Sequence, residues 1–168
     1  MKRQTDYGYD IKPVYTPKDI ANLDYEKDVG NPGSYPFVRG YYPNGYRDRV
    51  WTRRMTAGLG SSKQTNEVLK QYRRMGQTQG MLVIHDRVSA MPIDADHPVG
   101  RRESGVLGWH GASLLEFEEL MDGIPLTGQS ITLLGSAAMS CMRLAYVVAL
   151  AEKRGIDLKE VHGSVTEY

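Results

Sequence analysis

The 168-residue chain has little of several features that would place it in a particular class of protein. Its single cysteine, Cys141, excludes an internal disulfide framework and a zinc site built from several cysteines, which is typical of the reducing cytoplasm. Neither sign of charge dominates, since 21 Lys and Arg residues oppose 20 Asp and Glu residues, so no global field favours nucleic acid or a membrane surface. The most apolar stretch, residues 137–151, is too short for a membrane span and contains Arg143. We therefore expect a cytoplasmic protein that binds neither nucleic acid nor membrane.

The sequence is also short of aliphatic residues for its size. Its length fits one domain that could bury a core of its own. Yet the mean hydropathy is -0.46, and the chain holds 18 glycines and 11 tyrosines. A self-contained domain of this length usually has a richer aliphatic core. The composition therefore predicts that part of the core lies elsewhere.

Residues 1–60 are rich in proline and tyrosine. Proline fixes the backbone and removes a hydrogen-bond donor, so this segment cannot run as a long helix or a central strand. Asn31, Pro32 and Gly33 predict a loop within it. We expect an extended arm that lays its tyrosines on another surface. A disordered tail is the alternative, against which the density of aromatic residues argues.

Beyond residue 60, apolar patterns and capping signals alternate between helix and strand. They predict helices over residues 63–75, 113–123 and 136–153 and strands over residues 81–84, 130–134 and 161–165. This order is typical of right-handed βα units in a parallel sheet. Three strands would form an incomplete sheet with an exposed edge, so we expect a partner chain to complete it. The chain is thus predicted to consist of an arm, residues 1–60, and a partial α/β sheet, residues 61–168.

A cationic and aromatic stretch near the end of the arm is the strongest candidate for a binding segment. Guanidinium groups and tyrosine rings suit recognition of phosphate and adenine, whether in a nucleotide-like cofactor tail or in nucleic acid. A solvated loop with surface ion pairs is the alternative. The arginines and tyrosines of this stretch are Tyr41, Tyr42, Tyr46, Arg47, Arg49, Arg53 and Arg54.

Two further groups of residues are candidates for chemistry. His85 and Asp86 directly follow the first predicted strand. In a βα barrel the carboxyl ends of the strands form the active-site face, although a lone histidine is more often structural. Asp94, Asp96 and His97 resemble metal ligands by type, but nothing in the sequence completes a site around them. We therefore predict no metal site.

Several short motifs then stand in a fixed order along the chain. They are Tyr35-Pro36-Phe37-Val38-Arg39-Gly40-Tyr41-Tyr42-Pro43, Trp51-Thr52-Arg53-Arg54, Ala57-Gly58, Thr65-Asn66-Glu67, Gly76-Gln77-Thr78, Asp94-Ala95-Asp96-His97-Pro98, Asp122-Gly123-Ile124-Pro125-Leu126 and Ala151-Glu152-Lys153-Arg154-Gly155. In this order and spacing they resemble the large subunit of methylmalonyl-CoA mutase and related adenosylcobalamin-dependent acyl-CoA mutases. The resemblance covers about residues 10–168 and is specific to the family rather than to a substrate.

The resemblance implies a (β/α)8 barrel in which coenzyme A threads the axis and adenosylcobalamin lies across the carboxyl-terminal face. In this family, homolysis of the cobalt–carbon bond starts a radical rearrangement of the carbon skeleton of an acyl thioester. We therefore expect an α/β fold: the N-terminal portion of a TIM barrel, about three strands, preceded by the Tyr/Pro-rich arm. The implied partners are a chain with the remaining barrel, a cobalamin-binding subunit that holds most of the cofactor, the acyl-CoA substrate and a G-protein chaperone of the mutase.

Five residues match family positions that contact the coenzyme A ester or lie near its thioester. Tyr42, Arg49, Thr52 and Arg54 match such positions, with the arginines on the phosphates or near the acyl group. Ser164 matches a family threonine near the thioester. The resemblance therefore implies the same role for the cationic and aromatic stretch as its composition does.

Other positions depart from the family. Thr56 stands where methylmalonyl-CoA mutases have an active-site tyrosine, and Leu82 replaces a polar residue near the substrate. His85 and Arg87 replace a phenylalanine and a leucine that face the corrin, and Leu107 matches another corrin-facing position. We predict that Thr56 and His85 are catalytic and that His85, Arg87 and Leu107 contact the cofactor. The larger space beside Thr56 favours a bulkier or differently functionalised acyl group over methylmalonyl-CoA.

Because a family large subunit is several times longer, two interpretations stay open. In the first, the chain is the N-terminal part of a split mutase, an isomerase subunit whose arm clasps a partner chain. In the second, it is a non-catalytic assembly or regulatory subunit derived from a mutase, which the loss of the family tyrosine favours. Binding of nucleic acid through residues 47–54 is a third alternative, against which the balanced charge argues.

Overall fold

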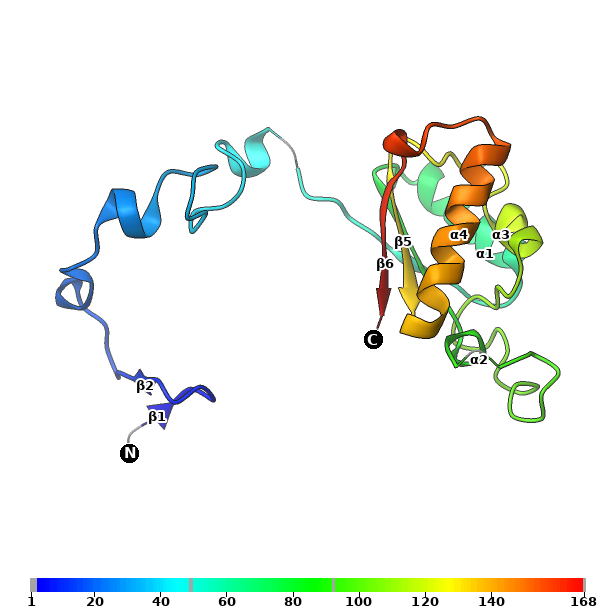
Figure 1. Ribbon diagram of the computed structural model, residues 1–168, viewed down its shortest axis with the longest axis horizontal. Helices are drawn as coiled ribbons and strands as arrows, with labels where there is room; N and C mark the ends of the chain where they lie inside the picture. The colour runs from blue at the N-terminus through cyan, green and yellow to red at the C-terminus, as the bar shows by residue number, and fades with distance from the viewer. Residues whose placement is uncertain (1–2, 49, 92, 168) are drawn as a thin grey trace. The chain divides into compact units, whose positions relative to one another are not determined.

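The computed structural model describes residues 3–48, 50–91 and 93–167 of the chain (Figure 1). Two compact units make up the chain, Met1–Trp51 and Thr52–Tyr168. The predicted boundary lies after residue 60, whereas the two compact units meet after Trp51. The reason is that residues 56–57 form a strand of the second unit's sheet.

The first unit consists of short turns without a core. Its elements are β1 (Arg3–Gln4), which pairs antiparallel with β2 (Asp10–Ile11), and the helical turns η1 (Pro17–Ile20), η2 (Tyr25–Val29) and η3 (Gly45–Arg47). None of its described hydrophobic side chains is buried. Local hydrogen bonds hold its turns, such as the one that the Lys27 backbone N–H donates to the Asp24 carboxylate at 2.8 Å.

The second unit is built on a parallel sheet of four strands. The sequence predicts three of these strands but misses β3, because two residues are too few to give a strand pattern. In spatial order the strands are β3 (Thr56–Ala57), β4 (Gly80–Ile84), β5 (Ser130–Gly135) and β6 (His162–Glu167). Neighbours in the sheet are also neighbours in the chain, which is the topology of successive βα units.

Helices connect the strands, and serine caps begin two of them. The Ser61 hydroxyl accepts from the backbone N–H of Gln64, and Gln64 in return accepts from the backbone N–H of Ser61. Ser113 accepts in the same way from Glu116. The helices are α1 (Ser62–Arg74), α2 (Arg87–Ala90), α3 (Leu114–Leu120), α4 (Ala137–Lys153) and the short turn η4 (Leu158–Glu160).

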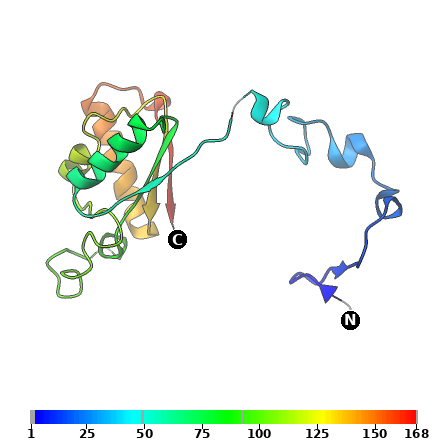
Figure 2. The same ribbon diagram turned by 180° about the vertical axis from the view of Figure 1, so that it is seen from behind.

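The core lies between the helices and one face of the sheet. Figures 1 and 2 show α1, α3 and α4 gathered on one side of the strands. Val83 and Leu133 of the sheet are buried together with Trp109, Phe117 and Leu150 from the helical side. Side chains alternate along a strand, so the residues between them point to the other face, which no helix of the described residues covers.

This α/β arrangement is compatible with part of a TIM barrel, where helices cover one face of a parallel sheet and the other face lines the barrel interior. Closure of the barrel and its completion by a partner chain remain predictions. Within the described residues, no helix combines the length and the apolar character that a membrane crossing requires.

Candidate functional site

One row of side chains runs across the uncovered face of the sheet. Thr56 pairs with Leu82, Leu82 pairs with Thr132, and Thr132 pairs with Ser164. Residues in register on neighbouring parallel strands point to the same side of a sheet. The register therefore brings three of the predicted site residues together, Thr56, Leu82 and Ser164, and adds Thr132 to them.

Arg54 extends along the same face from the segment before β3. Its Nη1 donates to Thr132 Oγ1 at 2.7 Å, and its Nη2 donates to Ser130 Oγ at 2.8 Å. Gly80 leaves the space for this crossing, because a Cβ atom at position 80 would lie 2.8 Å from Arg54 Nε and 3.0 Å from Thr52 Cγ2. Thr52 and Arg54 thus lie over the first residue of β4, at the amino end of the strands.

The charge of Arg54 has no counter-ion within the described part of the chain, since none of the ion pairs there includes it. Two neutral hydroxyl groups hold the guanidinium instead. A guanidinium fixed in this way presents its remaining N–H groups to an anionic or carbonyl oxygen. Ser130 and Thr132 were not predicted as site residues, although the alternation of Ser130 and Thr132 with apolar residues along β5 was the available signal.

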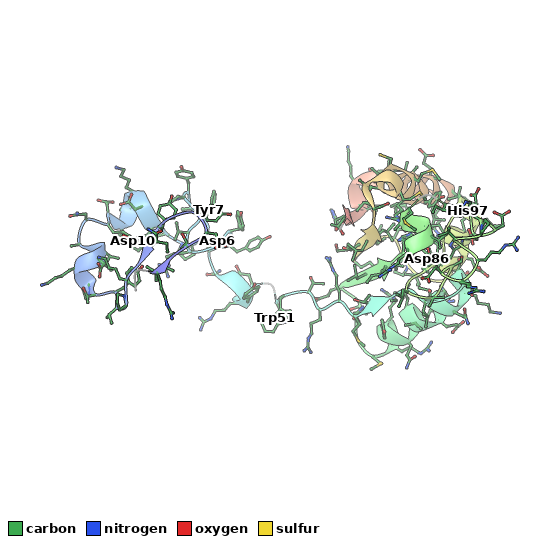
Figure 3. The ribbon with its side chains drawn as sticks, turned by 90° about the horizontal axis from the view of Figure 1, so that it is seen from below. Asp6, Tyr7, Asp10, Trp51, Asp86 and His97 are labelled. Atoms are coloured by element: carbon green, nitrogen blue, oxygen red, sulfur yellow. The ribbon has the colours of Figure 1, made fainter. Side chains whose placement is uncertain are left out.

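At the carboxyl end of β4, the buried carboxylate of Asp86 ties a loop to the sheet (Figure 3). It accepts hydrogen bonds from the backbone N–H groups of Ser89 at 2.7 Å and Gly105 at 2.6 Å, and it pairs with His110 Nδ1 at 3.0 Å. Burial alone would raise the pKa of Asp86, but these hydrogen bonds outweigh burial and lower it. Asp86 is therefore an ionised anchor of the loop that follows α2.

His85 is fully buried, unlike the other predicted cofactor contacts. Its ring centroid lies 4.8 Å from that of Trp109, and its Nδ1 lies 3.3 Å from the Leu134 carbonyl oxygen. Burial, and next the charge of Arg143, lower the pKa of His85 from 6.5 to about 3, so the ring is neutral near pH 7. Packing against Trp109 is the role that these contacts show.

Arg87 and Leu107 lie at the same end of the sheet and are exposed, Leu107 to 62%. Gly108 carries this loop close to β4, since a Cβ atom at position 108 would lie 2.2 Å from the carbonyl carbon of His85. A cationic and an apolar side chain are therefore accessible beside the carboxyl end of β4. A ligand at this edge can touch them without rearrangement of the core.

Two further predicted residues precede the second unit. Tyr42 belongs to the first unit and is 62% exposed, and Arg49 is not among the described residues. Asp96 and His97 are exposed on the loop after α2, where Figure 3 labels His97. The described residues contain no group of three or more His, Cys, Asp or Glu side chains that could hold a metal ion.

Comparison with known proteins gives one consistent family. The sequence model of the family described as methylmalonyl-CoA mutase matches residues 4–167. The 2-hydroxyisobutanoyl-CoA mutase large subunit of Aquincola tertiaricarbonis is 39% identical over 157 residues, which are 94% of this chain and 27% of the relative. The methylmalonyl-CoA mutase large subunit of Streptomyces virginiae is 30% identical over 162 residues, 96% of this chain and 22% of the relative. A probable mitochondrial methylmalonyl-CoA mutase of Caenorhabditis elegans is 34% identical over 161 residues, 96% of this chain and 21% of that protein. The chain thus spans about a quarter or less of these relatives.

Proposed function

The chain belongs to the methylmalonyl-CoA mutase family, and on this premise we propose that it supplies the N-terminal part of the barrel of an adenosylcobalamin-dependent acyl-CoA mutase. Its uncovered sheet face binds the coenzyme A thioester. Its relatives are isomerases, so the reaction of the assembled protein is a carbon-skeleton rearrangement of the acyl group.

The observation that carries this proposal is the position of Arg54. The guanidinium is held by Ser130 and Thr132 on the uncovered face and has no carboxylate partner within the described residues. An acyl-CoA carries phosphate groups and amide and thioester carbonyls, which are the acceptors that a fixed guanidinium recognises. Thr52 beside Arg54, together with Tyr42 and Arg49 of the preceding segment, extends the coenzyme A contact.

For the acyl group, we infer a branched acyl chain with a hydroxyl substituent, as in 2-hydroxyisobutanoyl-CoA. The relative named for that substrate is 39% identical to this chain. Thr56 supports the inference, because its side chain is small and offers a hydroxyl where methylmalonyl-CoA mutases have an aromatic ring. Leu82, next in the row, supplies an apolar contact for the branched carbon. Thr56 is the proposed catalytic residue beside the reacting carbon.

Arg87 and Leu107, the residues that would contact the cofactor, lie at the opposite end of the strands from Arg54. Arg87 and the exposed Leu107 fit a contact with the corrin edge, a large amphipathic surface, whereas the buried His85 supports these contacts from behind. When bound, adenosylcobalamin supplies the radical chemistry of the family. This chain's own residues hold the acyl-CoA and exclude water from the uncovered face.

Partner chains complete the protein in this proposal. They supply the remaining barrel, a cobalamin-binding subunit and, during cofactor loading, a G-protein chaperone, all in the cytoplasm. An apolar cavity of about 350 Å³ beside β6 supports completion of the barrel at that edge. Leu144, Val147 and Val165 line it, and Leu144 is 56% exposed. The tyrosines of the first unit are exposed and suit a clasp around a partner chain.

Turnover of a panel of acyl-CoA thioesters tests the proposal. The protein is purified with the chains that accompany it from its own source and is loaded with adenosylcobalamin. We expect isomerisation of 2-hydroxyisobutanoyl-CoA in preference to methylmalonyl-CoA. Arg54→Gln should raise KM about tenfold or more, because it removes a charged donor. Arg53→Gln is the matched control, since Arg53 makes no hydrogen bond in the described structure, and it should change KM by about twofold at most.

Exchange of Thr56 for tyrosine tests the substrate inference separately. The larger ring should lower kcat/KM for the hydroxylated acyl group relative to methylmalonyl-CoA, because it fills the space that Thr56 leaves. Unchanged substrate preference in Thr56→Tyr would contradict the role of Thr56.

One observation favours a second candidate, a non-catalytic assembly or regulatory subunit. Thr56 stands where methylmalonyl-CoA mutases have an active-site tyrosine. The two candidates differ in whether turnover depends on this chain's sheet face. Turnover that is identical with Arg54→Gln and with the natural chain would establish the assembly role.

A further inference from the structure

Two hydroxyl groups connect Arg54 to the last strand of the sheet. Arg54 Nη1 donates to Thr132 Oγ1 at 2.7 Å, and Thr132 Oγ1 lies 3.1 Å from Ser164 Oγ. The three side chains therefore form a chain of hydrogen bonds that crosses from the segment before β3 over β4 to β5 and β6. Ser164 is its exposed end, whereas Thr132 is only 6% exposed.

The chemistry of Arg54 determines which group donates and which accepts in each of these hydrogen bonds. A guanidinium only donates hydrogen bonds, so Thr132 Oγ1 must accept from it. The proton of the nearly buried Thr132 hydroxyl then needs an acceptor of its own. Within the described residues, Ser164 Oγ is the acceptor at hydrogen-bond distance. Ser164 thus accepts from Thr132, and its own proton points to whatever lies on the uncovered face.

Two features keep the chain in place. Ser130 Oγ accepts from Arg54 Nη2 at 2.8 Å, so the guanidinium cannot rotate away from Thr132 without losing a second hydrogen bond. Gly80 provides the gap above β4 through which Arg54 passes, since any Cβ atom there would lie 2.8 Å from Arg54 Nε. Ser130 and Gly80 hold Arg54 in place, and they thereby also fix the direction of the hydrogen bonds from Arg54 to Thr132 and Ser164.

We propose that Thr132 is a positioning residue that makes Ser164 a hydrogen-bond donor to the thioester carbonyl oxygen of the bound acyl-CoA. This inference rests on the proposed function. Ser164 lies in the same row of the sheet as Thr56, the residue proposed to stand beside the acyl group. The thioester adjoins the acyl group, so its carbonyl oxygen is the group that accepts the hydrogen bond from Ser164. The positive charge of Arg54 strengthens the donor through the shared hydroxyl groups.

Calorimetric titration with two ligands that differ only at the carbonyl tests the proposal. Acetyl-CoA carries the thioester carbonyl, and S-ethyl-CoA, a thioether, replaces it with CH2. The protein is again purified with its accompanying chains. Thr132→Val keeps the shape of the side chain but removes the hydroxyl, and it should weaken acetyl-CoA binding about three- to tenfold. Binding of S-ethyl-CoA should change by about twofold at most.

Thr132→Ser is the matched control, because it keeps the hydroxyl and should restore the natural preference for acetyl-CoA. Ser164→Ala, at an exposed position, should abolish that preference, and adding Thr132→Val to it should have no further effect on the ratio of the two affinities. Folding of each variant is checked by its thermal midpoint, and Thr132→Ala, compared with Thr132→Ser, replaces Thr132→Val if that variant does not fold.

Three results would overturn the proposal. Equal losses for both ligands in Thr132→Val would show that the hydroxyl does not act on the thioester carbonyl. Thr132→Ser behaving like Thr132→Val would show that side-chain volume matters instead. An unchanged preference for acetyl-CoA in Ser164→Ala would show that Ser164 is not the hydrogen-bond donor. A natural protein that binds neither ligand at millimolar concentration would refute the proposed function itself, which is a different outcome from any of these.

Discussion

The two units of the chain reach order by different means. In Thr52–Tyr168, helices bury one face of a parallel sheet, and Val83, Trp109 and Phe117 are fully buried. In Met1–Trp51, side chains of the same apolar character are exposed, Tyr7 to 89% and Tyr41 to 77%. The hydrophobic effect therefore accounts for the second unit by itself, while the first unit has no comparable internal source of stability.

The difference separates what each region contributes. A buried core fixes the positions of Arg54, Thr132 and Ser164 to within hydrogen-bond geometry, as a binding face requires. Exposed tyrosines on short turns are suited to association, because a large aromatic side chain gains most when a partner covers it. The sheet unit is thus the proposed binding scaffold, and the first unit the proposed clasp.

Limited proteolysis should show the largest difference between the two units. In the chain by itself, trypsin should cut at Lys18 and Lys27 at least about 100-fold faster than within α1 or α4, because cleavage inside a packed helix requires opening of the core. Mass spectrometry of the fragments over time gives both rates. Similar rates in the two units would contradict the comparison, and slower cutting of the first unit on addition of the accompanying chains would support the clasp.

Asp86→Asn should be the most destabilising single substitution considered for the sheet unit, by about 3 kcal/mol. The amide cannot accept from both backbone N–H groups and also pair with His110, so a buried polar group is left unsatisfied. Urea denaturation measures the free energy of unfolding. Asp94→Asn, on the exposed loop, is the control and should change it by less than about 0.5 kcal/mol. Equal effects of the two substitutions would refute the anchoring role of Asp86.

His85→Phe should change how stability depends on pH. The pKa of His85 is about 3 in the folded chain against an ordinary 6.5. Between pH 6.5 and pH 3, the imidazole therefore binds a proton in the unfolded chain but not in the folded chain. Stability should therefore fall as the pH drops from 6.5 towards 3, by about 1.4 kcal/mol per pH unit from this residue. Phenylalanine removes that contribution, and the Leu134 carbonyl keeps the hydrogen bond from the backbone N–H of residue 85.

Urea denaturation at a series of pH values between 4 and 7 measures this slope. His97→Gln, which changes an exposed histidine, should leave the slope as it is in the natural chain. An equal slope in His85→Phe and the natural chain would mean that His85 is not held neutral.

The smallest effect is expected for the first unit. Tyr41→Ser should change the free energy of unfolding of the sheet unit by less than about 0.5 kcal/mol, because the ring is 77% exposed. The same substitution should weaken association with accompanying chains, which analytical ultracentrifugation measures. If Tyr41→Ser lowered the free energy of unfolding of the chain by itself by several kcal/mol, Tyr41 would be part of a packed core, which contradicts the contrast between the two units.

Local signals predicted the elements of the sheet unit well. Apolar runs located β4 and β5, and the Ser61 and Ser113 caps located the starts of α1 and α3. The sequence missed β3, since its two residues are a strand only because they pair with Leu82 and Val83. Strand pairing is a tertiary property that no pattern in residues 56–57 reveals.

The sequence likewise predicted only some residues of the candidate site. Residue types and family resemblance pointed to Arg54 and Ser164, whereas Thr132, which joins them, was recognised only from the register of β5 and β6. Asp86 was expected at an active-site face because it directly follows a strand. Its carboxylate is instead buried and accepts a hydrogen bond from the backbone N–H of Gly105 in the loop that folds over it. Neither fact is encoded by spacing along the chain.

The most direct test of the account is hydrogen–deuterium exchange of the protein, with its accompanying chains, in the presence and absence of acetyl-CoA. We predict slower exchange of backbone amides in residues 52–57, 130–135 and 162–167, which contribute the uncovered face of the sheet, and little change in α1 and α3 on the covered side. Protection confined to the helices, or none in these three segments at saturating acetyl-CoA, would contradict the claim that this face binds the coenzyme A thioester.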